Sequence, residues 1–121
     1  MLFHYQIRSY FLYTGKTDMR KGIDSLSGIV SNELKKNPLT GDLFIFMNSR
    51  RNQLKMLHWQ GDGFALYYKR LEKGTYELPS ADQMNCLHLT SDRLLYILQG
   101  VVLKSVQLRT RYEHAIVEKQ Q

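Results

Sequence analysis

Apolar residues between positions 19 and 34 recur at the spacing of a helix. The apolar positions of this stripe are Met19, Ile23, Leu26, Val30 and Leu34. They are separated by four, three, four and four residues, which matches the 3.6-residue period of a helix with one apolar face. Thr17 or Asp18 has the side-chain type of a helix N-cap. Asn37-Pro38 ends the pattern, because the residue before proline avoids helical geometry. The spacing therefore predicts one long amphipathic helix.

Short apolar runs separated by turn residues predict strands elsewhere in the chain. The predicted strands are Tyr10–Tyr13, Leu43–Asn48, Gln53–Trp59, Phe64–Arg70, Thr75–Leu78 and Cys86–Leu89. Ser49-Arg50-Arg51-Asn52 forms a turn between two of these strands, and Gln60-Gly61-Asp62-Gly63 has the Gly/Asp chemistry of a tight hairpin. Glu72-Lys73-Gly74 turns the chain again into the short strand Thr75–Leu78, so four of the strands should follow one another as an antiparallel β-meander.

A second, shorter helix is predicted at Asp92–Gln99, with Ser91 as its cap and Gly100 at its C-terminus. Residues 101–108 are ambiguous between strand and helix, and the chain from Arg109 onward is polar. We therefore expect a single α+β domain over residues 1–108 and a polar tail over residues 109–121. In this fold the long helix packs on one face of the antiparallel meander, and the short C-terminal helix lies near its edge or other face.

The two hairpin turns predict a register, and the register sorts the side chains between two faces. Met47 should face Leu54, Ile45 should face Met56, and the aliphatic face containing these residues should lie beneath the long helix. The other face carries Phe44, Phe46, Asn48, Gln53, Lys55, Leu57, Trp59, Phe64, Leu66, Tyr68 and Arg70. Aromatic groups beside basic ones are typical of a platform for nucleic-acid bases. The same residues are also consistent with core beneath the second helix, or with a combination in which only the Lys55/Arg70 end is exposed.

The chain has 121 residues and a net charge of +6, with 17 Lys and Arg against 11 Asp and Glu. Residues 43–74 hold six basic side chains and two acidic ones, which is a net charge of +4. A concentrated basic region favours a polyanionic partner such as nucleic acid, although surface charge also serves solubility. No apolar run approaches the roughly 18 residues of a membrane helix. The chain start lacks a secretory signal pattern, and a single Cys86 suits a reducing compartment. We expect a cytoplasmic protein without a membrane segment.

Two pairs of basic residues are the sharpest candidates for contacts with nucleic acid. Arg50 and Arg51 occupy a hairpin tip, where both cannot point into a core. Arg20 and Lys21 would lie in the first turn of the long helix, where the helix dipole disfavours cations by roughly 0.3–1 kcal/mol each. A bound phosphate would reverse that effect, and compensation by Asp18 or Asp24 is the alternative. The candidate nucleic-acid-binding residues are Arg50, Arg51, Lys55, Lys69, Arg70, Arg20 and Lys21.

Catalytic and metal-binding patterns are weak in this sequence. Cys86 and His88 form the only close pair of soft ligands, whereas zinc sites need three or four. Asp42 and the Gln53-Leu54-Lys55 segment resemble part of a restriction-type nuclease site, but two-metal cleavage needs a further carboxylate. We therefore expect no catalytic residue, no metal and no cofactor.

Several segments together resemble a known family. They are Thr17-Asp18-Met19-Arg20-Lys21-Gly22, Pro38-Leu39-Thr40-Gly41-Asp42-Leu43-Phe44-Ile45-Phe46, Arg50-Arg51, Leu54-Lys55, Trp59, Gly61-Asp62-Gly63-Phe64 and Tyr68-Lys69-Arg70-Leu71-Glu72-Lys73-Gly74. This order resembles the small accessory protein, called TnpB or Orf2-like, of the insertion sequence 66 family of bacterial transposons. It is unrelated to the RNA-guided nuclease that shares the TnpB name.

The resemblance covers roughly residues 10–103, and it implies a non-catalytic helper encoded beside a separate transposase. The partners that it implies are DNA at the transposon ends and the transposase of the same element. Nucleic-acid binding through a basic β-hairpin is the first hypothesis for the molecular role. A protein–protein adaptor that docks on the transposase through the aromatic face is the alternative, and a nuclease is the third.

Overall fold

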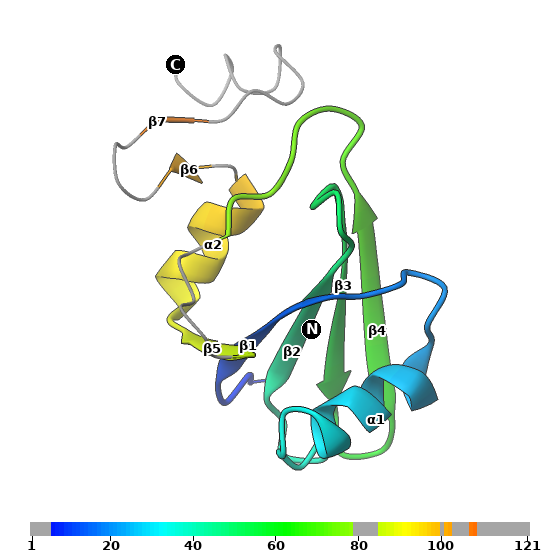
Figure 1. The fold of residues 1–121 in the computed structure, drawn as a ribbon. Coiled ribbons are helices and arrows are strands. Elements are labelled where there is room, and N and C mark those ends of the chain that lie inside the picture. Colours follow the sequence, from blue (N-terminus) through cyan, green and yellow to red (C-terminus); the bar gives the residue numbers. More distant parts are fainter. Residues whose placement is uncertain (1–5, 79–84, 100, 103–106, 109–121) are drawn as a thin grey trace.

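The structure is a computed structural model, and it describes residues 6–78, 85–99, 101–102 and 107–108. Five strands form one mixed sheet in the order β4-β3-β2-β1-β5 (Figure 1). The strands are β1 (Tyr10–Lys16), β2 (Leu43–Met47), β3 (Gln53–Trp59), β4 (Phe64–Arg70) and β5 (Cys86–Leu89). The helices are α1 (Ile23–Asn32) and α2 (Ser91–Gln99), and β6 (Val101–Val102) pairs with β7 (Gln107–Leu108) in a separate two-stranded sheet. The predicted tail, residues 109–121, lies outside the described residues.

The predicted antiparallel meander with one long helix is wrong as a description of the fold. Strands β2, β3 and β4 are antiparallel neighbours, but β1 pairs with β2 in parallel and with β5 in antiparallel fashion. Parallel neighbours need a crossover connection, and the segment that contains α1 supplies it here. Local turn chemistry predicts the hairpins, whereas the β1–β2 pairing joins residues that are more than thirty positions apart and has no local signal.

The predicted register of the hairpins is confirmed. Met47 pairs with Leu54, Ile45 with Met56, and His58 with Ala65. Gly61 has a φ of 93° at the β3–β4 turn, a left-handed conformation that glycine adopts without strain. The observed bounds of β3, β4 and β5 are those that the apolar runs predict.

Helix α1 is much shorter than predicted, because the residues before Ile23 form a turn instead. The N-cap is Gly22 rather than Thr17 or Asp18. Asp18 uses its side chain to bind the backbone N–H of Arg20 at 2.9 Å, and its carbonyl accepts the N–H of Lys21 at 3.1 Å. Asp side chains that bind nearby backbone in this way compete with helix formation. The apolar period continues beyond both helix ends because Met19 and Leu34 pack against the same core without being helical.

The two faces of the sheet have separate cores, each beneath one helix (Figure 1). Leu26, Ile29 and Val30 of α1 pack with Phe44 and other residues of the aromatic face. The prediction that α1 covers the aliphatic face is therefore wrong. An apolar stripe shows that a helix has a buried side, but the handedness of the crossover decides which face of the sheet it covers.

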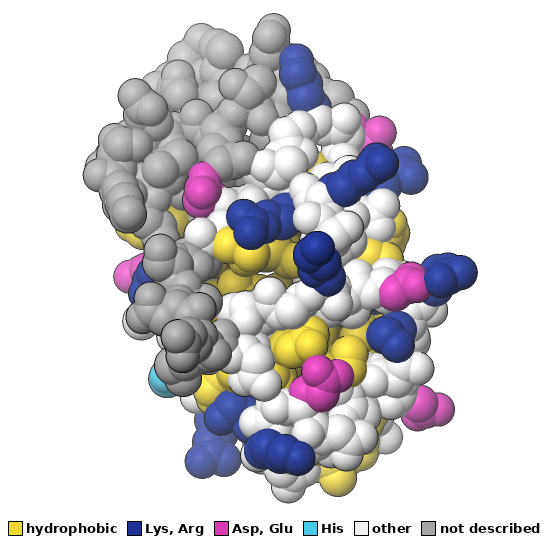
Figure 2. Space-filling view, viewed as in Figure 1, with side chains coloured by type: hydrophobic (Ala, Val, Ile, Leu, Met, Phe, Trp, Pro, Cys, Tyr) yellow, Lys and Arg dark blue, Asp and Glu magenta, His cyan; other side chains and the backbone are white. Residues whose placement is uncertain are grey.

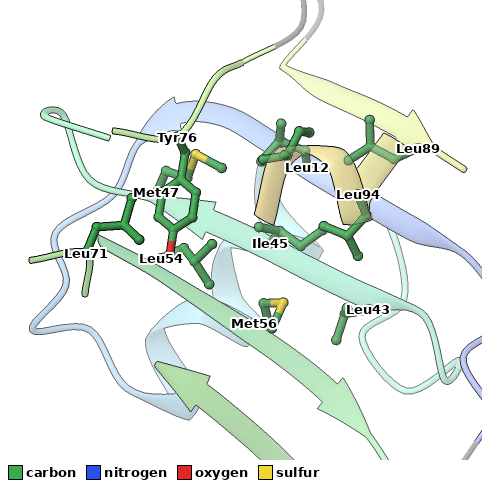
Figure 3. Packing of buried hydrophobic residues seen from close by; sticks show 11 residues of the cluster. Leu12, Leu43, Ile45, Met47, Leu54, Met56, Leu71, Tyr76, Leu89 and Leu94 are labelled. Atoms are coloured by element: carbon green, nitrogen blue, oxygen red, sulfur yellow. The ribbon is translucent and has the colours of Figure 1, made fainter. Parts of the chain in front are cut away.

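The aliphatic face is covered by α2 and by the segment that follows β4. Figure 3 shows Leu94 of α2 near Ile45, and Tyr76 beside Met47 and Leu54. The predicted strand Thr75–Leu78 does not form; instead, the backbone N–H of Tyr76 donates to the carbonyl of Arg51 at 2.6 Å. This bond ties the segment to the β2–β3 turn and lets the Tyr76 side chain fill the core.

Helix α2 lies close to its predicted position and begins one residue earlier, at Ser91. The hydroxyl of Thr90, rather than Ser91, accepts the backbone N–H of Arg93 at 3.2 Å and caps the first turn. Gly100, the predicted C-terminal residue, lies outside the described residues. No helix in the described ranges has both the length and the apolar character needed to cross a membrane.

Candidate nucleic-acid interface

The end of β1 bulges away from β2 and starts one wall of a groove. Leu12 pairs with Ile45, but the next pair is Lys16 with Met47, so β1 uses two extra residues over this stretch. Gly15 lies within the bulge, and a Cβ added there would come within 2.5 Å of the Tyr13 ring. The Tyr13 hydroxyl donates to Glu33 Oε1 at 2.8 Å, which fixes that ring. The bulge therefore depends on a residue without a side chain, and it directs the chain after Lys16 out of the sheet.

The wall continues through residues 17–22, which we call the motif loop. The backbone N–H of Thr17 donates to the carbonyl of Met47 at 2.9 Å and anchors the loop to the sheet. The Arg20 guanidinium binds Asp18 with two nitrogens, Nη2 at 2.6 Å and Nε at 3.0 Å. These hydrogen bonds, with that from the Arg20 backbone, lower the pKa of Asp18 to about 2. Asp18 is therefore ionised at neutral pH and neutralises Arg20.

This geometry corrects the prediction for Arg20 and Lys21. Both residues precede the N-cap Gly22, so neither lies in the first helical turn, and the argument from the helix dipole does not apply to them. The carboxylate that compensates Arg20 is Asp18, not Asp24, and the Arg20 side chain remains 91% exposed. The hypothesis of a phosphate site at this helix end is therefore dropped.

The β2–β3 turn forms the second wall, and its backbone is held in place by an asparagine. Asn48 Oδ1 accepts the backbone N–H groups of Asn52 and Gln53, both at 3.0 Å. Its Nδ2 donates to Asn52 Oδ1 at 2.7 Å. Arg51 adopts a φ of 58°, which a non-glycine residue takes only where its surroundings require it. Arg50 and Arg51 are therefore displayed on a well-defined turn rather than on a loose loop.

Both arginines of this turn are exposed, as the sequence predicts. Neither has an acidic partner among the described residues, where the two ion pairs are Arg20–Asp18 and Arg70–Glu72. Their guanidinium groups therefore remain available for a ligand, and guanidinium matches phosphate with two parallel hydrogen bonds.

Lys55 joins the sheet to the motif loop, and Tyr68 lies beside it on the next strand. They are cross-strand partners on β3 and β4. The Lys55 ammonium donates to the carbonyl of Lys21 at 2.8 Å and lies 5.7 Å from the centroid of the Tyr68 ring. That distance is within the range of a cation–π contact. The Tyr68 side chain is 52% exposed, so an aromatic surface and a fixed positive charge lie together at this end of the sheet.

Between these parts lies an open groove of 640 Å³, which we call the motif groove. It is lined by Lys16, Thr17, Asp18, Met19, Arg20, Asn48, Ser49, Gln53 and Tyr68. Its volume is in the range of ligand-binding clefts, and its lining combines polar side chains with one aromatic ring. Figure 2 shows that basic side chains on the displayed face are spread between uncharged surface rather than gathered in one continuous patch.

The structure brings most of the predicted binding residues to one end of the sheet. Arg20 and Lys21 belong to the motif loop, Lys55 binds the loop backbone, and Arg50 and Arg51 lie in the adjoining turn. Arg70 shares the Lys55 face, but its guanidinium is paired with Glu72 at 3.0 Å. Lys69 pairs with Leu54 in register and therefore lies on the opposite face. Lys16 also lines the groove but was not predicted, because the predicted strand Tyr10–Tyr13 ends before it, whereas β1 continues to Lys16.

The aromatic face is mostly core rather than surface. Phe44, Phe46 and Leu57 are buried beneath α1, so the interpretation as core is correct for them, although the covering helix is α1 and not the second helix. The Lys55/Arg70 end is less buried, as in the predicted combination. The surface on which the adaptor hypothesis relied is therefore largely occupied by the protein's own helix.

The nuclease-like residues are not brought together. Lys55 pairs with Phe46, which lies four residues beyond Asp42, a separation of about 13 Å along a strand. Asp42 is buried and accepts the hydroxyl of Thr40 at 2.6 Å. Within the ranges that the structure describes, no three His, Cys, Asp or Glu side chains are grouped so that they could hold a metal ion.

Comparisons with known proteins place this chain in a family. A model of the family described as IS66 Orf2-like protein matches residues 8–108. Two similar proteins come from Sinorhizobium fredii. The uncharacterized protein y4hO is 38% identical over 91 residues, which cover 75% of this chain and 78% of that protein. The uncharacterized protein y4jC is 30% identical over 88 residues, covering 73% and 74% of the two chains. No solved structure matches.

Proposed function

The chain belongs to the IS66 Orf2-like protein family and is an accessory protein associated with an insertion sequence, and we propose that it acts by binding nucleic acid. The proposed contact surface is the basic end of the sheet: the β2–β3 turn, the motif loop and the neighbouring strand residues Lys55 and Lys16. DNA at the transposon ends is the proposed ligand, and the transposase of the same element is the proposed protein partner.

One observation supports this proposal above the others. Arg50 and Arg51 lie on a turn whose backbone is held by Asn48, and both are exposed without acidic partners among the described residues. Two unpaired arginines at a fixed spacing suit the phosphates of a nucleic-acid backbone, because planar guanidinium groups bind phosphate bidentately. Lys16 adds positive charge on the wall of the groove, and the Lys55 ammonium adds a second charge beside Tyr68.

The proposal predicts that Arg50 and Arg51 together carry much of the electrostatic attraction to DNA. In an Arg50→Ala/Arg51→Ala variant, affinity for a transposon terminal inverted repeat and for unrelated duplexes should fall alike. The slope of log affinity against log salt should flatten by about two units at most, because each phosphate contact contributes roughly one unit. Fluorescence anisotropy with labelled duplexes over a salt series measures both quantities.

A Lys35→Ala/Arg93→Ala variant is the matched control. It removes the same charge from two exposed positions, one after α1 and one on α2, so its affinity should stay near that of the unchanged protein. Equal losses in both variants, or unchanged affinity and slope in the arginine variant, would contradict the proposal. DNA retention only in the presence of transposase, without salt dependence, would favour the adaptor hypothesis.

A further inference from the structure

We propose that the motif groove binds unpaired nucleotides, with a base stacked on Tyr68 and the backbone phosphates held by Lys16 and the Arg50–Arg51 turn. This inference rests on the proposed function and specifies the form of nucleic acid that the site takes.

The Tyr68 ring is exposed, because no other element of the described structure packs over it. Tyr68 and Tyr96 are the two strongly exposed tyrosines of the described ranges, at 52% and 42%. Tyr96 lies on α2, whereas Tyr68 lines the motif groove beside the Lys55 ammonium. The ammonium is itself held by the Lys21 carbonyl. An exposed ring beside a fixed cation is the arrangement on which single-stranded nucleic acids stack their bases.

The uncharged part of the lining can recognise the edges of a base. Neither the Ser49 hydroxyl nor the Gln53 side-chain amide makes a hydrogen bond within the described part of the chain. The Asn48 amide, by contrast, is used up in holding the turn. A hydroxyl and an amide together offer both donors and acceptors. They can therefore pair with the exposed edges of an unstacked base, whichever base it is.

The charges of the groove indicate which path the sugar–phosphate backbone of a bound nucleic acid should take. Asp18 is ionised and lies on the motif-loop side, where it neutralises Arg20. Phosphates should avoid that carboxylate and pass the end of the groove at Lys16, which pairs with Met47 next to the Arg50–Arg51 turn. The base then lies inward against Tyr68, and the sugar–phosphate backbone lies outward.

Stacking on Tyr68 distinguishes an unpaired strand from a duplex. Inside a double helix each base face is covered by the neighbouring base pairs, so no interior face is free to meet a ring. A base that is unpaired, at a strand end or in a melted segment, exposes that face. The proposed contacts of the Arg50–Arg51 turn are to phosphate alone, so they form with a single strand or with a duplex. The proposed contact with Tyr68 forms only with an unpaired base.

The test compares binding of a labelled twelve-nucleotide oligo-thymidylate strand with binding of a twelve-base-pair duplex. Tyr68→Ala should weaken single-strand binding by about 5- to 150-fold, the range expected for loss of one base stack worth roughly 1–3 kcal/mol. Duplex affinity should change less than about twofold. Tyr68→Phe, which keeps the ring, should retain single-strand binding, and Tyr96→Ala is the matched control for loss of an exposed tyrosine. An oligonucleotide carrying 5-bromouracil should photocrosslink to the peptide that contains Tyr68.

The outcomes separate this inference from the proposed function. If Tyr68→Ala leaves single-strand affinity unchanged, or lowers single-strand and duplex affinity equally, the inference is wrong. In that case duplex binding that still depends on Arg50 and Arg51 leaves the proposed function intact. If neither oligonucleotide binds, the proposed function fails as well.

Discussion

Single residues decide the shape of the site through their own short-range bonds. Asp18 turns the motif loop by binding the Arg20 backbone, and Asn48 shapes the β2–β3 turn by accepting two backbone N–H groups. Neither residue needs to touch a ligand to matter, because each fixes the backbone that carries a neighbouring cation. Side chains that bind nearby backbone are the usual source of such turns.

His58 offers a test at this scale because it is buried within β3, with 1% of its surface exposed. Burial lowers the pKa of His58, since the imidazolium form loses its hydration. As the pH falls below about 6.5, the unfolded chain takes up a proton that the folded protein resists. The free energy of unfolding should therefore decrease between pH 7.5 and pH 5.5, as measured by urea unfolding followed through Trp59 fluorescence.

Two variants identify the residue responsible for this pH dependence. His58→Gln should remove most of the decrease, because the titrating group is gone. His88→Gln, which changes an exposed histidine on β5, should keep it. An equal decrease in the unchanged protein and in His58→Gln would show that other groups cause it.

At the scale of elements, the end of β1 is where the sheet opens into the motif groove. The bulge around Gly15 interrupts the parallel pairing of β1 with β2, which ends at the pair Lys16–Met47, and the chain then runs through the motif loop to α1 (Figure 1). The Lys55–Lys21 bond then holds the returning loop against the sheet. The groove is therefore a consequence of how one strand ends rather than of any single side chain.

Gly15→Ala should destabilise the protein by about 1–3 kcal/mol, the usual cost of forcing an extra group into a filled site. The added methyl group would displace the Tyr13 ring, which is held by Glu33 and packs 6.0 Å from the Phe46 ring. Urea unfolding measures the loss. In a Tyr13→Val background the same substitution should cost much less, because the clashing ring is absent.

Gly63→Ala is the control for this prediction, because a Cβ at Gly63 meets no atom within 4 Å. We expect it to change stability by no more than about 0.5 kcal/mol. If Gly15→Ala is as well tolerated as Gly63→Ala, then the bulge does not depend on glycine.

At the scale of the whole molecule, one sheet carries two cores on opposite faces. Alternate residues of β2 contribute to the two cores: Phe44 and Phe46 to the core beneath α1, and Leu43, Ile45 and Met47 to the core beneath α2. Because β2 is shared, disruption of either core removes support from the other. We therefore expect the folded part of the chain to unfold as one cooperative unit.

Ile97→Ala tests this coupling, because Ile97 is a fully buried residue of α2. Its truncation should lower the free energy of unfolding by about 2–5 kcal/mol. Trp59, the single tryptophan, packs against Phe64 on the α1 side of the sheet. Its fluorescence transition should nevertheless shift together with the far-ultraviolet circular dichroism. Leu95→Ala, at an exposed position of the same helix, should shift neither, and two separate transitions in Ile97→Ala would contradict the coupling.

The sequence by itself determined those features that arise from neighbours along the chain. Short apolar runs and Gly/Asp turn chemistry predicted the bounds and register of β3 and β4, and the capping residues Ser91 and Gly100 located α2. The exposure of Arg50 and Arg51 also followed, because two adjacent charged residues at a hairpin tip have no route into a core. The family resemblance rested on motifs of the same local kind.

Only the tertiary structure decided which elements meet. The parallel β1–β2 pair, the side of the sheet that α1 covers and the core position of Tyr76 all join residues that are distant in sequence. The motif groove belongs to this class, since its walls come from the β1–α1 connection, the β2–β3 turn and β4. An apolar period shows that a side chain is buried, but it does not show which element the side chain packs against. The motif loop was not predicted, because the sequence pattern indicated a helix across Thr17–Gly22. Pairings at long range are chosen by the packing of the whole chain, and no local pattern records that choice.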